Sequence, residues 1–486
     1  MYYLMNKDNI SAVLKEDTEN IFSDSLSLNV EKICGKIPIG FKNINTWIDG
    51  RKASKHNSHL QKIMRQMGCD DNREFIKITH AATINDTFWI KSDKENISWK
   101  QVSLYQNQFT EVISKLAFEG VGLYDAVFSS TSPELACDGS FRKCFRKEKY
   151  VGEFGSDIFL YKRGGEIGAG FEPYCESMAS EIAKFISSDA VSYNLVTLHG
   201  KLASQCNLFT NEKYGYAQFA KVADMQELDL RTIFDYFSKI GSEQEFREML
   251  VIDSLCFNQD RHAGNYGVLF DTDTLDIIKM SPVFDLNIAL FPYVENEDFS
   301  NIGDVLFEYS PKLGNDFTRI GQMGLNDKIR DKVKDICDFS FEFRGDDKFL
   351  PERVKCIENI VRKQAKAILS KEKLQTKDVF FSEKEIDYAI KKEQSEKAAL
   401  NLEKFMKLLD DMHFGENIFI SECCSTDTVQ CYIEKDSLMI TVDFLENSIN
   451  VAFNCKSVSD EKLKDIDNEF YNSYIDICNK FKEVEM

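Results

Sequence analysis

The chain has 486 residues, a length typical of two to four domains, and its hydrophobic content of 43% is sufficient for packed cores. Its net charge of −20 argues against a protein that binds nucleic acid over its whole surface, because neutralising phosphates requires clustered cations. No apolar run approaches the ~20 residues of a membrane span, no signal peptide is evident, and the 14 scattered cysteines include no C-x-x-C pair, so we expect a cytoplasmic protein with reduced thiols.

Residues 1–125 form an amino-terminal accessory region to which the sequence assigns no role. Apolar residues at helical spacing within 51–67, followed by Gly68, predict a helix. This stretch is also the most basic of the chain, which fits either a solvated helix face or a surface for a phosphate or a partner. Further along, residues 88–90 predict a strand and residues 99–116 a second helix.

Residues 126–225 alternate between predicted strands and turns. Within them, residues 134–145 predict two short strands joined at Asp138 and Gly139, a turn whose backbone N–H groups can approach phosphate oxygens. A plain hairpin is the alternative interpretation of this turn. Residues 152–155 contain two glycines and are a second candidate, although their position favours the next hairpin turn.

A predicted strand over residues 157–165 carries Lys162 near its end. Taken alone, such a lysine usually extends its side chain along the sheet to solvent. The Asp and Asn residues downstream favour instead a lysine that pairs with the α- and β-phosphates of a nucleotide. The partner of that lysine is a glutamate of the next helix, which we predict over residues 174–186, after Pro173, a favoured first helical residue.

Two glutamates of this helix compete for the lysine. Glu176 shares a helix face with Ala179 and Ala183, small residues that allow close approach to a sheet. Glu181 lies three residues before Lys184, a spacing typical of an exposed ion pair. We therefore predict that Glu176 is the partner of the lysine.

Residues 191–209 predict two further strands, and residues 214–222 a third. If these strands form a nucleotide site, the segment that leaves the last strand would lie against the base and read its edge with backbone groups. We therefore expect Gln218, Phe219 and Ala220 to contact the nucleotide base.

The mostly helical region 226–372 contains the motif with the clearest chemistry. Asp260 and Asn265 are five residues apart, with His262 between them, and Asp285 follows after an apolar strand and a turn. Phosphotransfer needs this order, because one carboxylate acts on the acceptor hydroxyl while an amide and a second carboxylate hold Mg²⁺ on the phosphates. The Asp-to-Asn offset equals that of the protein-kinase catalytic loop. The alternative is a polar loop in which Asp and Asn serve turn chemistry.

This stretch resembles the catalytic core of HipA-like serine/threonine kinases, in which an Asp-x-His-x-x-Asn loop precedes a Pro-x-x-Asp metal segment. The matching residues are Asp260, His262, Asn265, Pro282 and Asp285. The resemblance covers about residues 130–370. Because Leu286 and Asn287 follow Asp285, the chain has no D-F-G. Phosphatidylinositol kinases share the Asp-Arg-His loop and the Asn offset, so the loop alone leaves the acceptor open.

The resemblance implies ATP as the phosphoryl donor, and a Ser or Thr hydroxyl of a protein, including this one, as the acceptor. It implies that Asn265 and Asp285 bind Mg²⁺ and that Asp260 is the base or the residue that positions the acceptor. His262 is expected to support the loop. Members of the family often act as toxins paired with a small DNA-binding antitoxin, so a small antitoxin-like regulator is a candidate partner.

The resemblance also implies which residues hold the nucleotide. The family's phosphate loop has a glycine with a lysine four residues later, as Gly139 and Lys143 are here, and Ser140 lies between them. Lys162 would hold the α- and β-phosphates, with Glu176 orienting it.

The rest of the chain predicts accessory structure. Residues 287–315 lie where kinases carry activation and substrate segments, and residues 353–369 predict a helix. After a charged linker, residues 379–486 predict a separate α+β domain for interaction or packing, with a long helix over 383–412. Its predicted strands cover residues 418–420, 429–434, 438–444 and 449–453.

The expected fold class is therefore α+β: a bilobed protein-kinase-like fold with additional regions at both ends. The β-rich N-lobe would span 126–225 and the helical C-lobe 226–372. The expected function is an ATP- and Mg²⁺-dependent protein serine/threonine kinase. Two alternatives stay open, a lipid or small-molecule kinase like the phosphatidylinositol kinases, and a catalytically silent nucleotide-binding scaffold.

Overall fold

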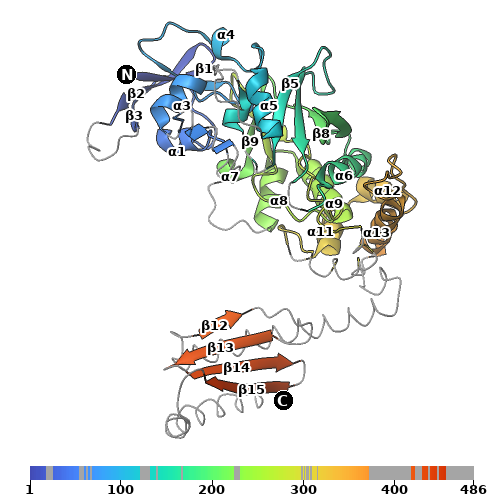
Figure 1. The fold of residues 1–486 in the computed structure, drawn as a ribbon. Helices are drawn as coiled ribbons and strands as arrows, with labels where there is room; N and C mark the ends of the chain where they lie inside the picture. Colours follow the sequence, from blue (N-terminus) through green and yellow to red (C-terminus); the bar gives the residue numbers. More distant parts are fainter. Residues whose placement is uncertain are drawn as a thin grey trace. The chain divides into compact units, whose positions relative to one another are not determined.

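The structure is a computed structural model that describes part of the chain. The described residues are 1–17, 26–53, 60–61, 64–65, 68–69, 71–120, 132–137, 139, 141–165, 168–223, 230–296, 299, 302, 306, 309–314, 316–370 and the backbone of four strands between 418 and 455. They form a mixed α+β structure with four antiparallel sheets (Figure 1). The chain divides into two compact units, Met1–Ser300 with Tyr309–Leu374, and Asn301–Glu308 with Gln375–Met486. Within the described ranges, no helix combines the length and the apolar character that crossing a membrane requires.

The first unit begins with a four-stranded sheet in the order β3-β2-β1-β4. Its strands are β1 (Tyr2–Asn6), β2 (Asn9–Glu16), β3 (Leu28–Ile33) and β4 (Phe88–Ser92), and the helices of this region are α1 (Ile44–Asp49), α3 (Asn72–Thr79), α4 (Trp99–Val102) and α5 (Glu111–Glu119). The predicted strand 88–90 is confirmed within β4. The helix predicted over 99–116 is interrupted: the Asn107 side chain donates hydrogen bonds to the Lys100 and Ser103 carbonyls, and such local bonds compete with helix continuation.

The basic stretch 51–67 does not form one exposed helix. Arg51 lies in a turn, with only 7% of its surface exposed, and its guanidinium donates two hydrogen bonds of 2.7 Å to the Asp86 carboxylate. This charge is therefore neutralised inside the protein. Much of the rest of the stretch lies outside the described residues, although 60–61 and 64–65 are helical.

The second sheet has the strand order β5-β6-β8-β7. Its strands are β5 (Lys143–Lys147), β6 (Ile158–Arg163), β7 (Asn194–Leu198) and β8 (Lys201–Asn207), and α6 (Glu172–Ile186) contacts β6, β7 and β8. The strands predicted within 157–165 and 191–209 and the helix predicted over 174–186 are confirmed. Between β5 and β6, the Gly155 N–H donates to the Gly152 carbonyl, which is the hairpin turn expected at 152–155.

The first of the two strands predicted within 134–145 is wrong. Residues Pro133–Ala136 instead form a short 3₁₀ helix. Proline lacks the N–H that a strand ladder uses, and its fixed φ suits a helical turn. The fully buried Glu134 carboxylate accepts hydrogen bonds from the Phe145 N–H (3.0 Å) and the Ser114 hydroxyl (2.7 Å), which attaches this helix to β5 and α5.

Burial gives Glu134 a pH-dependent effect on stability. Desolvation raises the pKa of this carboxyl, although its two hydrogen bonds oppose the shift. A pKa raised by folding contributes stability at low pH that is lost as the pH rises through the folded-state pKa. We expect Glu134→Gln, which keeps an acceptor oxygen but cannot ionise, to raise the Tm at pH 8 and to reduce the difference in Tm between pH 5 and pH 8.

Thermal unfolding at both pH values measures this effect. The matched control is Glu111→Gln, which changes an exposed glutamate at the start of α5. If Glu134→Gln and the wild type show the same change in Tm between the two pH values, the ionisation of Glu134 does not limit stability.

The third sheet has the order β11-β10-β9, and its strands lie on both sides of the 260–265 motif in the sequence. Its strands are β9 (Tyr214–Gln218), β10 (Gly267–Asp271) and β11 (Ile277–Met280). The strand predicted over 214–222 is shorter than expected, because the short helix α7 (Phe219–Val222) begins directly after Gln218. The chain therefore turns at the segment where we expected the base to be read.

The amino-terminal region is hydrogen-bonded to this third sheet. The Tyr216 N–H donates to the Asn85 carbonyl at 2.7 Å. The buried Asn6 amide donates to the Thr272 carbonyl at 2.9 Å. Residues from the first 90 positions therefore pack directly against the strands that carry the site.

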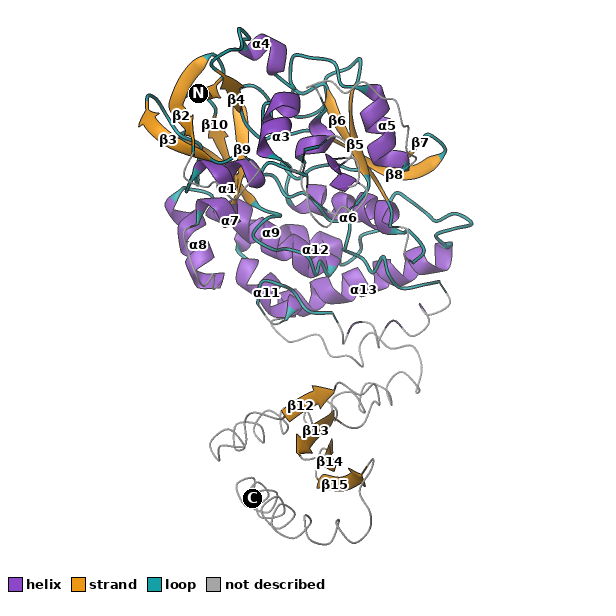
Figure 2. Cartoon of the chain, turned by 60° about the vertical axis from the view of Figure 1, so that its left-hand side comes forward, coloured by secondary structure: helices purple, strands orange, loops and turns teal. Residues whose placement is uncertain are grey.

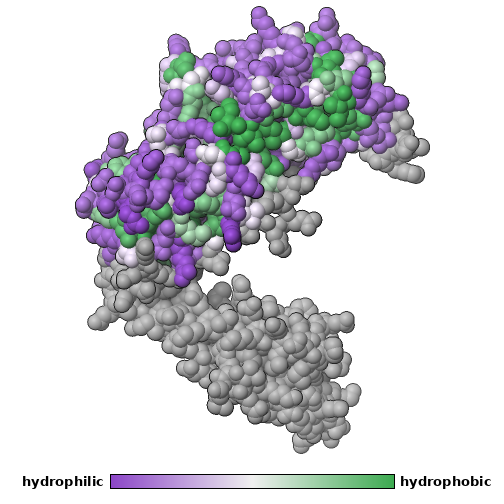
Figure 3. Space-filling view, turned by 180° about the vertical axis from the view of Figure 1, so that it is seen from behind, coloured by the Kyte–Doolittle hydropathy of each residue, from purple (hydrophilic) through white to green (hydrophobic). Residues whose placement is uncertain are grey.

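Helices dominate the rest of the first unit. They are α8 (Leu230–Lys239), α9 (Glu243–Cys256), α11 (Phe317–Gly324), α12 (Asp327–Ile336) and α13 (Pro351–Ser370). Figure 2 shows these helices gathered on one side of the unit and the strands of its three sheets on the other. The helix predicted over 353–369 is confirmed within α13. Figure 3 shows a band of hydrophobic residues crossing an otherwise largely hydrophilic face of this unit.

The second unit contains a four-stranded antiparallel meander, β12-β13-β14-β15. Its strands are β12 (Ile418–Ser421), β13 (Val429–Lys435), β14 (Leu438–Leu445) and β15 (Ser448–Cys455), so all four predicted strands are confirmed. The helix predicted over 383–412 lies outside the described residues.

Candidate active site

A cavity of about 510 Å³ is lined by many of the predicted site residues. Its apolar lining includes Ile84, Leu160, Val191, Phe209, Tyr216 and Phe284. Its polar lining includes Gly139, Lys143, Lys162, Gln218, Asp260, His262, Asn265, Asp285 and Asn287. A concave apolar site with a few converging polar groups is the usual form of a small-molecule pocket.

Lys162 links two carboxylates at this cavity. It lies on β6 with 6% of its surface exposed, and its ammonium group contacts the fully buried Glu176 carboxylate of α6. The same nitrogen lies 2.7 Å from Asp285 Oδ1. The Ser204 hydroxyl of β8 donates to the other oxygen of Glu176. The Lys162 ammonium group therefore joins the second sheet to α6 and to the segment after β11.

Lys162 and Asp285 hold each other in the ionised state, whereas burial raises the pKa of Glu176 despite the nearby ammonium group. Burial alone would lower the pKa of Lys162, but Asp285 and Glu176 outweigh it and raise that pKa above its usual range. Burial alone would likewise raise the pKa of Asp285, but Lys162 outweighs it and holds that pKa below its usual range. At neutral pH the site therefore presents an ammonium group beside an ionised carboxylate.

The two glutamates of α6 have different surroundings. Glu176 contacts Lys162, whereas Glu181 accepts a hydrogen bond of 2.7 Å from the Glu342 N–H. The expected Glu181–Lys184 pair is wrong, because Lys184 instead pairs with Glu153 at 2.9 Å. Glu181 therefore connects α6 to the loop before α13 and lies away from the cavity.

This difference yields a paired test. We expect Glu176→Gln to reduce turnover strongly, because a neutral amide no longer holds the Lys162 ammonium in place. Glu181→Gln should change turnover little, because its amide oxygen can still accept from the Glu342 N–H. Steady-state kinetics on both variants decides the assignment. A severe loss in the Glu181 variant beside a near-normal Glu176 variant would reverse it.

The predicted catalytic loop, residues 260–265, is built around a buried arginine. Arg261 has 1% of its surface exposed and donates to both carboxylate oxygens of Asp253 on α9, at 2.8 and 2.9 Å. Its remaining N–H groups reach the Asn265 carbonyl (2.7 Å) and the Phe284 carbonyl (2.8 Å). One side chain thus fixes both ends of the loop and the residue before Asp285. The apolar helix pattern around Asp253 gave no signal for this pairing.

The loop side chains point toward the cavity from fixed positions. The Asn265 amide nitrogen donates to the Asp260 carbonyl at 2.9 Å, which orients its amide oxygen. His262 Nδ1 accepts from the Gly264 N–H at 3.0 Å, and His262 Nε2 lies 3.9 Å from Asp260 Oδ2. His262 therefore supports the loop backbone, as its predicted role requires.

Tyr193 positions Asp285 from the side of the second sheet. Asp285 has a φ of +57°, a conformation that residues other than glycine adopt rarely, and its N–H donates to the Tyr193 hydroxyl oxygen at 3.1 Å. The Lys162 ammonium lies 5.1 Å from the centre of the Tyr193 ring. Neither Tyr193 nor the cavity-lining Asn287 was predicted as a site residue, because no motif connects them to the loop.

Asn265 and Asp285 fit a divalent cation only with help from a ligand. Both line the same cavity and offer oxygen atoms, which Mg²⁺ prefers. Within the described ranges, no three His, Cys, Asp or Glu side chains form a group that could hold a metal by themselves. Mg²⁺ commonly uses one or two protein oxygens together with substrate phosphates. This pair fits that use.

The phosphate-loop residues approach the cavity at Gly139 and Lys143. Gly139 has a φ of +97°, and a Cβ at this position would lie 2.3 Å from Lys143 Nζ, so a larger residue would displace the ammonium. Both residues line the cavity. Ser140 lies outside the described residues.

The predicted base-reading segment is only partly at the cavity. Gln218 lines it, but the Phe219 N–H donates to the Tyr266 carbonyl and the Ala220 N–H to the Ala263 carbonyl, each at 2.9 Å. Because α7 turns these backbone groups toward the catalytic loop, they are already bonded within the protein. The structure therefore places Gln218, and neither Phe219 nor Ala220, where it could contact a base.

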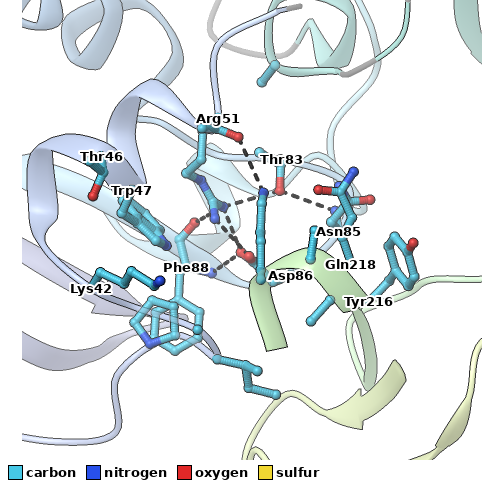
Figure 4. Close-up of a pocket in the computed structure, with 18 of the residues that line it drawn as sticks. Lys42, Thr46, Trp47, Arg51, Thr83, Asn85, Asp86, Phe88, Tyr216 and Gln218 are labelled. Carbon is cyan, nitrogen blue, oxygen red and sulfur yellow. Dashed lines mark hydrogen bonds and ion pairs between the residues drawn. The ribbon is translucent and has the colours of Figure 1, made fainter. Parts of the chain in front are cut away.

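A second cavity of about 230 Å³ adjoins the first (Figure 4). The two share the lining residues Asn85, Ala136, Cys137, Tyr216 and Gln218. Figure 4 shows the Arg51–Asp86 pair in its wall, with Lys42 and Trp47 nearby. Residues 84 and 85 thus extend the wall of the main cavity into the amino-terminal region, which the sequence did not predict.

No family model matches the chain. The curated proteins also contain no match. Among solved structures, the chain is similar to the Helicobacter pylori proinflammatory kinase CtkA, with 16% identity over 50% of this chain and 94% of that chain and a TM-score of 0.35. It is also similar to a structure of the Shewanella oneidensis MR-1 toxin–antitoxin system HipA, HipB and its operator DNA, with 10% identity over 78% of this chain and 99% of that chain and a TM-score of 0.41.

Proposed function

We propose that the protein is a HipA-like, bilobed kinase that transfers the γ-phosphoryl group of ATP to a Ser or Thr hydroxyl of a protein. The observation that carries this proposal is that Lys162 contacts both Glu176 and Asp285 at the wall of the cavity that Asp260 and Asn265 also line. A plain polar loop does not require a buried lysine shared by two carboxylates from distant segments. The same arrangement favours an active kinase over a silent scaffold.

Each side chain has a role in this chemistry. Lys162 holds the α- and β-phosphates, oriented by Glu176, and Lys143 beside Gly139 faces the phosphates from β5. Asn265 and Asp285 hold Mg²⁺, which neutralises phosphate charge when bound. Asp260 accepts the hydrogen bond of the acceptor hydroxyl and orients its oxygen for attack. Catalysis is then mainly positioning and charge stabilisation, because the transition state of phosphoryl transfer is loose.

The test is incubation of the full chain with γ-labelled ATP and Mg²⁺, alone and with a cell lysate, followed by mass spectrometry. We expect Mg²⁺-dependent phosphoserine or phosphothreonine on this protein or on a lysate protein. Label in a lipid or a small molecule, with none in protein, would overturn the proposed acceptor. Absence of both ATP binding and label transfer would overturn the proposed function. From the scattered cysteines we also propose a cytoplasmic location, and from the sequence resemblance a small antitoxin-like regulator as a partner.

A further inference from the structure

A lysine from outside the motif contacts the catalytic carboxylate. Lys312 Nζ lies 2.5 Å from Asp260 Oδ1, although the two residues are 52 positions apart. Lys312 belongs to the segment after Asp285, and its side chain is 52% exposed. It can therefore reach Asp260 from the solvent side while Asp260 faces the cavity.

Buried neighbours hold this lysine in place. Pro311 and Leu313 are buried on either side of the exposed Lys312. Tyr309 lies three residues before Lys312, and the centre of its ring is 5.1 Å from the centre of the Phe291 ring. Alternating buried and exposed positions direct the Lys312 side chain away from the core, and the anchors limit how far its backbone can move.

The lysines that line the cavity contact other groups, whereas Lys312 contacts Asp260, a residue of the cavity wall. Among the described residues that line it there are two lysines: Lys162, which contacts Glu176 and Asp285, and Lys143, whose ammonium lies over Gly139. Charge develops on the oxygens of the transferred phosphoryl group, and positive groups placed there lower the barrier. Lys312 is at the carboxylate where that group must meet the acceptor.

We propose that Lys312 is a further catalytic residue, whose ammonium group contacts the γ-phosphoryl group during transfer. This inference rests on the proposed function. The acceptor oxygen forms a bond to phosphorus, the bond from phosphorus to the bridging β,γ-oxygen breaks, and ADP leaves with that oxygen. The acceptor proton passes to Asp260 through Oδ2, while Oδ1 keeps its contact with Lys312. Lys312 gains and loses no proton and supplies only charge.

The test compares two ligands that differ at the transferred group. ADP with Mg²⁺ occupies the nucleotide site, and adding fluoroaluminate supplies a mimic of the phosphoryl group in transit. We expect Lys312→Ala to bind ADP·Mg²⁺ within a few-fold of wild type and to bind ADP·Mg²⁺·fluoroaluminate more weakly, by on the order of 10²-fold, as when one charge-stabilising donor is removed. ATP turnover should fall by a similar factor, and Lys312→Arg should retain part of both.

Lys328→Ala is the matched control, because it removes an exposed lysine of α12 and the same charge. If Lys312→Ala lowers the affinity for both ligands equally, or loses activity only because its Tm is lower, the role of Lys312 is structural. If Lys312→Ala turns over faster than wild type, Lys312 inhibits the reaction. Each of these results overturns the inference, as does an unchanged affinity for the fluoroaluminate complex. A wild-type protein that binds neither ligand overturns the proposed function itself, and this inference with it.

Discussion

Asp285→Ala is expected to abolish phosphotransfer and to weaken the binding of ATP·Mg²⁺. The change removes an oxygen ligand from a hard cation. It also removes the carboxylate that lies 2.7 Å from Lys162 Nζ, so the lysine loses one of the two groups that hold it at the phosphates. Since a single charge-stabilising group is worth ~10²–10³ in turnover, losing two functions at once should exceed ~10³.

Turnover and isothermal titration with ATP, each with and without Mg²⁺, measure these two effects separately. The control is Asp276→Ala, which removes an exposed carboxylate from the β10–β11 hairpin. Both variants should be compared by Tm, so that loss of fold is separated from loss of chemistry. Wild-type turnover in a folded Asp285→Ala variant would show that the metal assignment is wrong.

Asp260→Asn should separate nucleotide binding from chemistry. Asparagine has the same shape, keeps an oxygen that can accept from Lys312, and leaves the backbone carbonyl to which Asn265 donates. Nucleotide affinity should therefore stay within a few-fold of wild type. Turnover should fall by on the order of a hundredfold or more, because the amide cannot act as a base on the acceptor hydroxyl.

The measurement pairs ATP affinity with single-turnover transfer to the acceptor found by mass spectrometry. Asp276→Ala serves again as the control for loss of one carboxylate. If Asp260→Asn loses nucleotide binding while remaining folded, Asp260 belongs to the metal site. Unchanged transfer would instead remove it from the reaction.

The sequence predicts the residues of the site whose positions depend on local structure. Asp260, Asn265 and Asp285 lie within 26 positions of one another, and a short loop followed by a hairpin brings such residues to one edge of a sheet. Lys162 and Glu176 were predicted from the strand and the helix that carry them. The expectation that only one of the two glutamates of α6 faces the lysine follows from helix geometry, and the contacts of Glu176 and Glu181 agree with it.

The site residues that the sequence did not predict are positioned by contacts between distant parts of the chain. Lys312 reaches Asp260 across 52 positions, and Tyr193 binds the Asp285 N–H across 92. Periodicity shows which face of an element is apolar, but it does not show which distant polar side chain will meet it. Arg261 is part of the motif, but it holds the loop in place because it is buried beside Asp253, and the loop sequence does not show this burial.

Two predictions rested on the local sequence pattern alone, and the structure differs from each of them. The strand expected before Gly139 failed because Pro133 and the buried Glu134 favour a helical turn there. In the segment expected to read the base, the Phe219 and Ala220 N–H groups donate to the Tyr266 and Ala263 carbonyls, and only Gln218 of the three predicted residues lines the main cavity. In both cases a hydrogen bond to a distant partner overrode the pattern of the segment itself.

The hydrogen bonds between the amino-terminal region and the third sheet give the cavity a composite wall. Ile84 and Asn85 line it, and the Asn85 carbonyl accepts from the Tyr216 N–H of β9. A ligand that touches both parts stabilises both by mass action, so occupancy of the cavity and attachment of the first 90 residues are thermodynamically linked. Such linkage is reciprocal. A protein that binds the amino-terminal sheet and shifts residues 84 and 85 would change ligand affinity without entering the cavity. Binding to this region could therefore regulate the site.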